Sequence, residues 1–272
     1  MSTNVNRIDR AFAALAASGK KGLLPYVTAG LPDLDTTEQI LEGLATAGAT
    51  AVELGFPYSD PIADGPTIQT SFTRVLERGI HVKDILAMVA RFRQRCAMPL
   101  LGMLSYTIVY RRGVERFIAE SAEAGLDGLI VPDLPLEEAA EISEAMSRAG
   151  LCLVMLVSPT TPPDRRRQIA ELSRGFVYYM SVTGITGERD RLPPELVDNV
   201  RALRRIAGRP VVVGFGISTA DHVRMVCTEA DGAIIGSALV RRIMAATDAG
   251  AKAEDVVRTA VEAVCEWMTG LP

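Results

Sequence analysis

Eight short runs of apolar residues recur along the chain, and segments with helical spacing of apolar residues separate them. The runs lie at 23–27, 49–54, 100–104, 128–131, 151–157, 176–180, 211–215 and 233–235. They are rich in Val, Ile, Leu and Tyr, which fits buried parallel strands better than half-exposed ones. The pattern therefore predicts eight parallel strands.

Helices are predicted between these runs from the spacing of apolar residues. The predicted segments are 35–47, 113–124, 136–149 and 194–207, with further ones at 5–17, 82–95 and 254–268. Several end in Ala-Gly immediately before the next strand, as expected for a glycine C-cap and a tight turn. This repeat of strand and helix argues against a β-sandwich or a helix bundle.

Eight strand–helix units in 272 residues favour a (β/α)8 TIM barrel over a doubly wound sheet, which usually has fewer strands at this length. Three helices are extra to that plan: one at the N-terminus, one after the second strand and one at the C-terminus. No linker rich in Pro, Gly or Ser interrupts the chain, so residues 1–272 are expected to form a single domain. The active site of such a barrel lies at the carboxyl ends of its strands.

Composition and charge narrow the possible classes of protein. The chain is 48% hydrophobic with a formal net charge of −4, which gives no reason to expect nucleic acid or an anionic membrane as partner. No signal peptide or membrane-spanning run is recognisable, so a cytoplasmic protein is expected. The four cysteines are widely separated, which argues against a disulfide framework or a metal site. Each is predicted to be a small buried hydrophobic residue. They are Cys96, Cys152, Cys227 and Cys265.

The segment 51–69 carries a carboxylate within an apolar strand and two more in the loop that follows. Alternation places Glu53 on the opposite face of the strand from its two apolar neighbours. Asp60 and Asp64 each lie next to a Pro or Gly. A carboxylate in apolar surroundings tends to have a raised pKa, which suits proton transfer. The alternative is a capping or salt-bridged Glu53 with two ordinary turn aspartates.

Glycine-containing turns follow the last three predicted strands. They lie at 181–187, 214–218 and 236–238. Glycine lets the backbone approach an anion, and the amides at a helix N-terminus point toward it. Glycines that merely permit tight turns are the alternative, but three neighbouring turns favour a phosphate site. The polar segment 183–191 is interpreted either as a lid that excludes water or as an ordinary surface loop.

The remaining candidates for chemistry are few. His81 and His222 both lie beside helical segments, so carboxylates are expected to handle protons. Asp133, after the fourth strand, is interpreted as a structural acid more readily than as a site residue. No Lys lies within a strand, which argues against a Schiff-base mechanism. Three tyrosines either line a pocket for an aromatic ligand or belong to the core: Tyr26, Tyr106 and Tyr178.

A series of motifs, in order along nearly the whole chain, resembles the tryptophan synthase alpha chain family. The motifs are PYVTAG at 25–30, ELGFPYSDPIADGPTIQ at 53–69, VPDLP at 131–135, GITG at 184–187, GFGIS at 214–218 and GSA at 236–238. The long block at 53–69 is highly specific, unlike an isolated glycine-rich loop.

The resemblance implies a lyase of L-tryptophan biosynthesis that cleaves indole-3-glycerol phosphate to indole and glyceraldehyde 3-phosphate without a cofactor. It makes Glu53 the general acid and base, which protonates indole C3 and helps to deprotonate the glycerol hydroxyl. It makes Asp64 the carboxylate that holds the indole N–H and stabilises the positive charge there. Thr186 matches the lid threonine that orients Asp64. The expected substrate-binding residues are Tyr26, Tyr178, Thr186, Gly187, Phe215, Gly216, Gly236 and Ser237, and four of these match phosphate-binding positions: Gly187, Gly216, Gly236 and Ser237.

The resemblance also implies a partner, a beta chain that carries pyridoxal phosphate and receives indole through a tunnel in an alpha2-beta2 complex. Pro57, Asp60 and Tyr106 are the expected contacts with it. After the third strand the family commonly reads Tyr-x-Asn-Pro or Tyr-Ala-Asn. This chain reads SYTIVY at 105–110 and lacks that partner-facing Asn.

Other functions fit parts of the same pattern. A non-catalytic barrel that binds a sugar phosphate and regulates a partner enzyme would be expected to lose Glu53 or Asp64, and both are present. A lyase that acts without a beta chain is another possibility. An indole-glycerol phosphate synthase or a sugar-phosphate isomerase is a third, although the lack of a strand-end Lys argues against the synthase.

Overall fold

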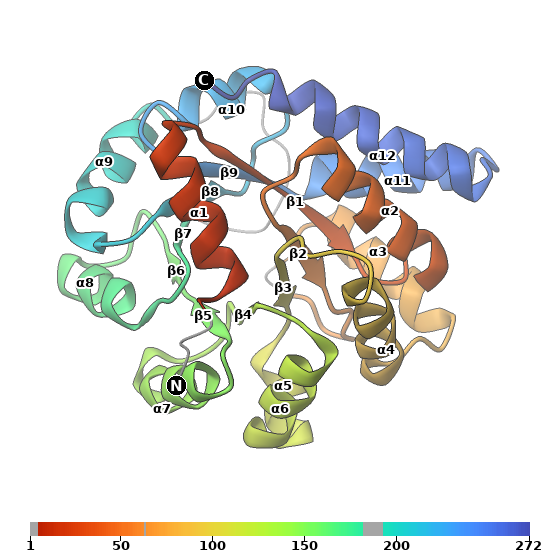
Figure 1. Cartoon of the computed structure of the whole chain (residues 1–272), viewed down its shortest axis with the longest axis horizontal. Coiled ribbons are helices and arrows are strands. Elements are labelled where there is room, and N and C mark those ends of the chain that lie inside the picture. The colour runs from red at the N-terminus through yellow and green to blue at the C-terminus, as the bar shows by residue number, and fades with distance from the viewer. Residues whose placement is uncertain (1–4, 63, 182–192) are drawn as a thin grey trace.

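A computed structural model describes residues 5–62, 64–181 and 193–272, and its strands form one parallel sheet that curves into a barrel (Figure 1). The strands are β1 (Gly22–Thr28), β2 (Val52–Gly55), β3 (Leu100–Met103), β4 (Gly128–Ile130), β5 (Cys152–Val154), β6 (Leu156–Val157), β7 (Val177–Met180), β8 (Val211–Gly214) and β9 (Gly232–Ile235). Their order in the sheet is β5-β4-β3-β2-β1-β9-β8-β7-β6. The strands therefore follow one another around the barrel in chain order, as the sequence predicts.

Helices surround the barrel and connect its strands (Figure 1). Those of the described chain are α1 (Arg7–Ser18), α2 (Leu34–Ala47), α3 (Pro66–Glu77), α4 (Val82–Arg93), α5 (Tyr106–Arg112), α6 (Val114–Ala124), α7 (Leu136–Arg148), α8 (Pro163–Leu172), α9 (Leu196–Ala207), α10 (Ala220–Val226), α11 (Ser237–Asp248) and α12 (Ala253–Met268). The predicted TIM barrel is confirmed, with extra helices α1, α4 and α12. No helix within the described ranges is long and apolar enough to cross a membrane.

The predicted single strand at 151–157 is wrong in one respect, because it breaks at Met155 into two short strands. β5 pairs with β4 on one side, and β6 pairs with β7 on the other. The break is bridged by the Tyr178 amide, which donates to the Met155 carbonyl at 3.0 Å. The barrel thus closes through a bend in one strand segment.

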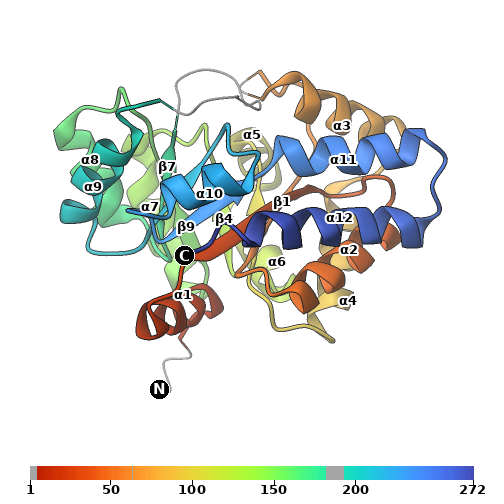
Figure 2. The ribbon, with the colours of Figure 1, turned by 90° about the horizontal axis from the view of Figure 1, so that it is seen from above.

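The inward-facing side chains of the strands pack together inside the barrel, and α1 covers one end of the barrel. Buried interior residues include Leu24, Leu101 and Val212 from the strands, and they contact Ile8 and Phe12 of α1. Figure 2 shows α1 on the lower side of the molecule, at the amino ends of the strands. The opposite, carboxyl end is left for the loops that carry the polar motifs.

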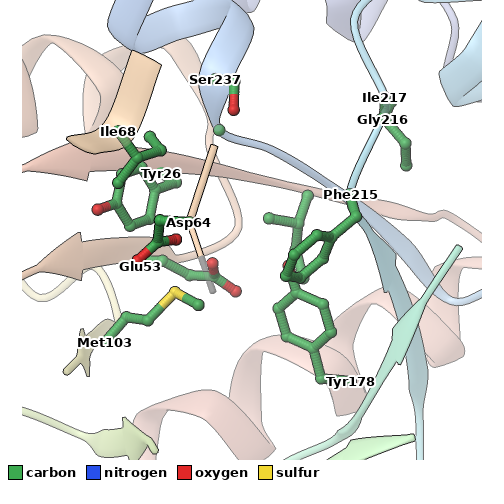
Figure 3. A pocket seen from close by; sticks show the side chains of 12 residues that line it. Tyr26, Glu53, Asp64, Ile68, Met103, Tyr178, Phe215, Gly216, Ile217 and Ser237 are labelled. Carbon is green, nitrogen blue, oxygen red and sulfur yellow. The ribbon is translucent and has the colours of Figure 1, made fainter. Parts of the chain in front are cut away.

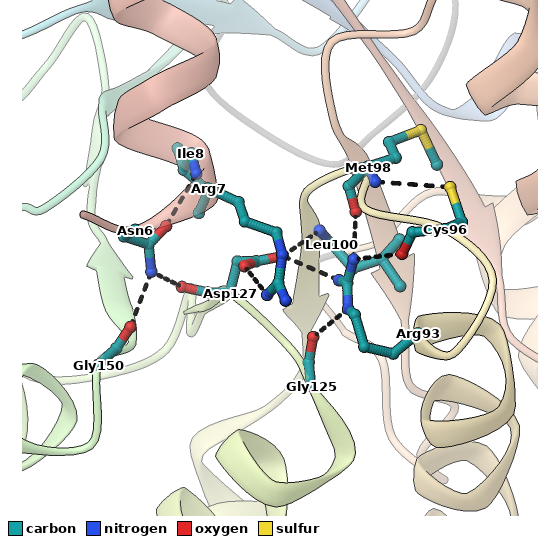
Figure 4. A network of polar contacts seen from close by, with 10 residues as sticks. All are labelled: Asn6, Arg7, Ile8, Arg93, Cys96, Met98, Leu100, Gly125, Asp127 and Gly150. Carbon is teal, nitrogen blue, oxygen red and sulfur yellow. Dashed lines mark hydrogen bonds and ion pairs between the residues drawn. The ribbon is translucent and has the colours of Figure 1, made fainter. Parts of the chain in front are cut away.

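A buried aspartate fixes α1 to the barrel (Figure 4). The Asp127 carboxylate accepts hydrogen bonds from Arg7 Nη1, Arg93 Nη2 and the Leu100 amide, each at 2.9 Å. Asn6 Nδ2 donates to the Asp127 carbonyl at 2.8 Å, while its Oδ1 caps α1. These contacts join α1, α4, β3 and the approach to β4 at the amino end of the barrel.

The cysteines depart from the expectation of four buried hydrophobes. Cys152 and Cys227 are buried, but Cys96 is half-buried and Cys265 is exposed. α12 turns Val264 and Trp267 toward the core, which leaves Cys265 on its outer face.

Candidate functional site

A cavity with about 470 Å³ of empty space opens at the carboxyl ends of the strands (Figure 3). It is lined by Tyr26, Glu53, Asp64, Ile68, Met103, Tyr178, Phe215, Gly216, Ile217, Ile234, Gly236 and Ser237. Eight of the predicted site residues therefore meet in one place: Tyr26, Glu53, Asp64, Tyr178, Phe215, Gly216, Gly236 and Ser237. Thr186 and Gly187 lie outside the described residues.

Glu53 points into this cavity from β2. It is aligned with Tyr26 of β1 and Leu101 of β3, and it is only 1% exposed. Neither carboxyl oxygen has a hydrogen-bond partner among the residues that the structure describes. Burial raises the pKa of Glu53 well above its usual value of 4.5, because the charged form loses its hydration. The side chain is therefore suited to carry a proton near neutral pH and to exchange it with a ligand.

Asp64 reaches the same cavity from the loop after β2, and Figure 3 shows its carboxyl group beside that of Glu53. Burial raises the pKa of Asp64 to about 6, while a hydrogen bond from Tyr58 opposes the rise. The Tyr58 hydroxyl donates to Asp64 Oδ2 at 3.4 Å, and its ring packs against Phe72 at 5.5 Å. At pH 7 Asp64 is therefore mainly ionised, whereas the more deeply buried Glu53 favours its neutral form. Two carboxyl groups whose pKa values differ in this way can take different roles in a reaction.

The structure separates the two aspartates of the loop after β2. Asp60 is exposed and accepts a hydrogen bond from Ser59 Oγ at 3.0 Å, outside the cavity. Ile62 is 86% exposed on the same loop. Pro57, in contrast, is buried within the chain. The loop thus turns one acid into the cavity and the other toward solvent.

Two strand-end glycines make room for the cavity tyrosines. A Cβ atom on Gly55 would lie 1.9 Å from the Tyr26 hydroxyl, and one on Gly214 would lie 2.0 Å from the Tyr178 hydroxyl. The Tyr178 ring meets Phe215 edge-on at 5.8 Å. These aromatic side chains line the cavity rather than only filling the core, and the glycines fix where their rings lie.

The ends of the last two β-strands provide a corner where glycine residues line the cavity. Phe215 and Gly216 have φ values of 72° and 75°, and Phe215 adopts this sterically unfavourable conformation without being glycine. Its carbonyl accepts a hydrogen bond from Ser181 Oγ. Gly236 and Ser237 begin the 12-residue helix α11 beside it. A helix N-terminus and glycine amides at one corner can bind an anionic group.

Asp133, the acid after β4, has a structural environment. Its carboxylate accepts hydrogen bonds from Ser105 Oγ at 2.6 Å and from the Tyr106 amide at 2.7 Å. It therefore anchors the start of α5, as the structural interpretation of the sequence predicts. Tyr106, which is half-buried, donates its hydroxyl to Glu138 at 2.5 Å.

Several lining residues were not singled out in the sequence. Much of the apolar wall of the cavity is formed by Ile68, Met103, Ile217 and Ile234. In the sequence, these apolar residues have the same spacing as residues of the hydrophobic core and cannot be distinguished from them. No group of three or more His, Cys, Asp or Glu in the described ranges could hold a metal ion.

Comparison with known proteins gives one consistent family. The family model described as tryptophan synthase alpha chain matches residues 12–268. The tryptophan synthase alpha chain of Rhodopirellula baltica is 46% identical over 255 residues, covering 92% of each chain, and that of Geobacter sulfurreducens is 47% identical over 237 residues, covering 87% of this chain and 90% of that protein. The crystal structure of tryptophan synthase subunit alpha from Legionella pneumophila matches with a TM-score of 0.90 and 35% identity over 98% of both chains.

Proposed function

We propose that this chain, which belongs to the tryptophan synthase alpha chain family, is a carbon–carbon lyase that divides its reaction between Glu53 and Asp64. As a member of that family it acts in L-tryptophan biosynthesis, where the alpha reaction is the retro-aldol cleavage of indole-3-glycerol phosphate to indole and glyceraldehyde 3-phosphate. The observation that carries the assignment of residues is Glu53, a buried carboxyl group without a partner among the described residues, facing a cavity that also holds Asp64.

The two ends of the cavity match the two ends of the substrate. The phosphate would bind at the backbone amides around Gly216, Gly236 and Ser237, at the start of α11. The indole ring would lie against the aromatic and aliphatic wall, which includes Tyr178 and Phe215. The glycerol chain would then span the space between, within reach of the two carboxyl groups.

Glu53 begins the reaction as a neutral acid. Its proton goes to C3 of the indole ring, which leaves a positive charge on the ring nitrogen and an ionised Glu53. The Asp64 carboxylate accepts the indole N–H hydrogen bond and stabilises this charge. Glu53 then takes the proton of the glycerol hydroxyl, the bond between the ring and the glycerol carbon breaks, and its electron pair returns to the ring. Indole and an aldehyde result, and Glu53 has regained its proton.

We also propose a beta chain as the partner, in an alpha2-beta2 complex. The loop after β2, which also carries Asp64 to the cavity, supports this because its Asp60 and Ile62 are exposed, and Tyr110 of α5 is 71% exposed as well. Large apolar side chains left exposed on a surface can contribute to an interface with another protein. Pyridoxal phosphate would belong to that partner and this chain would need no cofactor; the complex would be cytoplasmic.

Indole release from indole-3-glycerol phosphate, measured with and without an added beta chain, tests reaction and partner together. The wild-type protein should form indole, faster with the beta chain. Glu53→Gln should lower the rate by about 10²–10⁴-fold, the range of general acid–base catalysis, and Asp64→Asn by about 10²–10³-fold, the range for loss of one electrostatic stabiliser. Asp60→Asn, on the same loop but exposed, should retain the rate without the beta chain. Absence of indole in both conditions would reject the activity, and an unaffected Glu53→Gln variant would reject the assigned acid.

A further inference from the structure

Gln69 of α3 holds the turn that carries Asp64. Its side-chain nitrogen Nε2 donates to the Asp64 carbonyl at 2.7 Å and to the Pro61 carbonyl at 3.2 Å. The Asp64 amide in turn donates to the Pro61 carbonyl at 3.0 Å. Both acceptors of Gln69 are main-chain carbonyl oxygens, so only the NH₂ group of its amide can face them. The two ends of this turn are thus tied to one side chain.

The helix that carries Gln69 is itself fixed to the barrel. Ile68, Phe72 and Val75 are buried on one face of α3. Ser71, which is fully buried, shares a hydrogen bond of 2.8 Å with Thr28 of β1. Gln69 therefore extends from a rigid element to an irregular loop, and rigid elements hold functional groups more accurately than loops do.

We propose that Gln69 is a positioning residue for Asp64, one that holds the main chain of the acid-bearing turn so that the Asp64 carboxylate lies beside that of Glu53 in the cavity. The proposal rests on the function proposed above. Tyr58 makes the complementary contact, since its hydroxyl bonds the Asp64 side chain whereas Gln69 bonds the main chain. The titratable groups that face Asp64 are Glu53 from β2, Tyr26 from β1, Tyr178 from β7 and Tyr58 from its own loop.

Gln69→Glu replaces the hydrogen-bond donor of this side chain by an acceptor, with almost no change in its shape. A carboxylate offers no donor, and it would place an oxygen against two carbonyl oxygens. The turn should therefore release and expose Asp64 to water. Gln69→Met has a similar volume without a donor or a charge, so it separates the loss of hydrogen bonds from repulsion. Gln168→Glu makes the same chemical change on the exposed face of α8 and is the matched control.

Two measurements distinguish positioning from a general structural role. The first is kinetic: both Gln69 variants should lower kcat by about 10- to 100-fold, since a displacement near 1 Å has effects of this size. KM should change by less than about 3-fold, because the phosphate corner on the β8 and β9 loops does not depend on the turn. The second is the titration midpoint of Asp64, followed by carboxyl ¹³C NMR and assigned with Asp64→Asn. It should fall from about 6 toward its usual 3.8 as burial is lost.

The proposal is overturned if both Gln69 variants fold, keep the wild-type kcat and leave the Asp64 midpoint unchanged. Equal losses in Gln168→Glu would also overturn it, because charge alone would then explain the effect. If Gln69→Glu does not fold, Gln69→Met decides on the same two readouts. A wild-type protein that forms no indole would reject the proposed function, while the NMR midpoint, which needs no substrate, would still test the positioning.

Discussion

Replacing Asp64 by Asn is expected to stabilise the free protein above pH 6 and to lower the rate of indole formation strongly. Burial raises the pKa of this carboxyl group from 3.8 to about 6 in the folded chain. Between these values the unfolded chain releases a proton that the folded chain keeps. The contribution of Asp64 to the free energy of unfolding therefore falls as pH rises from about 4 to about 6, and it stays low at higher pH.

The size of the effect follows from the shift. A rise from 3.8 to about 6, at about 1.4 kcal/mol per pKa unit, corresponds to about 3 kcal/mol at pH 8. At pH 4 the same linkage gives only about 0.5 kcal/mol. A neutral Asn avoids the burial of charge and still accepts the Tyr58 hydrogen bond through its side-chain oxygen. The stabilisation should therefore be large at pH 8 and nearly absent at pH 4.

Urea denaturation of both proteins at pH 4 and pH 8 measures this difference. The free energy of unfolding of Asp64→Asn should exceed that of the wild type by about 3 kcal/mol at the higher pH. Asp60→Asn, an exposed neighbour with no cavity contact, should change the free energy of unfolding by less than about 0.5 kcal/mol. A gap for Asp64→Asn that is equal at the two pH values, or a variant that is less stable at pH 8, would refute the reasoning. Loss of activity in a more stable protein would mark Asp64 as a group retained for its function.

Three further substitutions test other parts of the molecule. Gly55→Ala places a Cβ atom 1.9 Å from the Tyr26 hydroxyl and should lower both indole formation and stability, the latter by about 1–3 kcal/mol in thermal unfolding; full activity would contradict the tight fit. Asp127→Ala leaves Arg93 without its carboxylate and should lower the free energy of unfolding by about 3–5 kcal/mol with little change in rate per folded molecule. Cys265→Ser should remove the fastest phase of labelling by a thiol reagent, because Cys265 is the exposed cysteine, and should change stability by less than about 0.5 kcal/mol.

The barrel could be predicted from the sequence because its strands are buried on both faces and so appear as continuous apolar runs. The face of Glu53 was equally predictable, since side chains alternate strictly along a strand. The break at Met155 was not, because it depends on pairing with two different neighbours, β4 and β7. Helix α3 was not predicted, although Ile68, Phe72 and Val75 have the spacing of a buried helix face. Its first residues also belong to the motif at 53–69, so in the sequence they are interpreted as part of the functional loop rather than as the start of a helix.

In the site, the sequence could identify the candidate acids but not the direction in which each one points. Asp60 and Asp64 stand in nearly the same local sequence, each beside a Pro or Gly, and residue type alone does not separate them. The course of the loop turns Asp64 inward and Asp60 outward. Gln69 and Tyr58 act through single contacts with this loop, and a single polar residue has no periodicity that would mark it.

The contacts of Asp127 with Arg7, Arg93 and Leu100 lie at the end of the barrel opposite the cavity. The attachment of α1 to the barrel is thereby secured by residues that lie outside the cavity. The attachment of α1 does not depend on the sequence of the loops at the cavity end, so a loop that carries no assigned acid can be varied without loosening it. New substrate preferences could thus be sought by exchanging the segment 105–110, with Asp64 retained and the Asp127 cluster kept constant as an internal standard for folding.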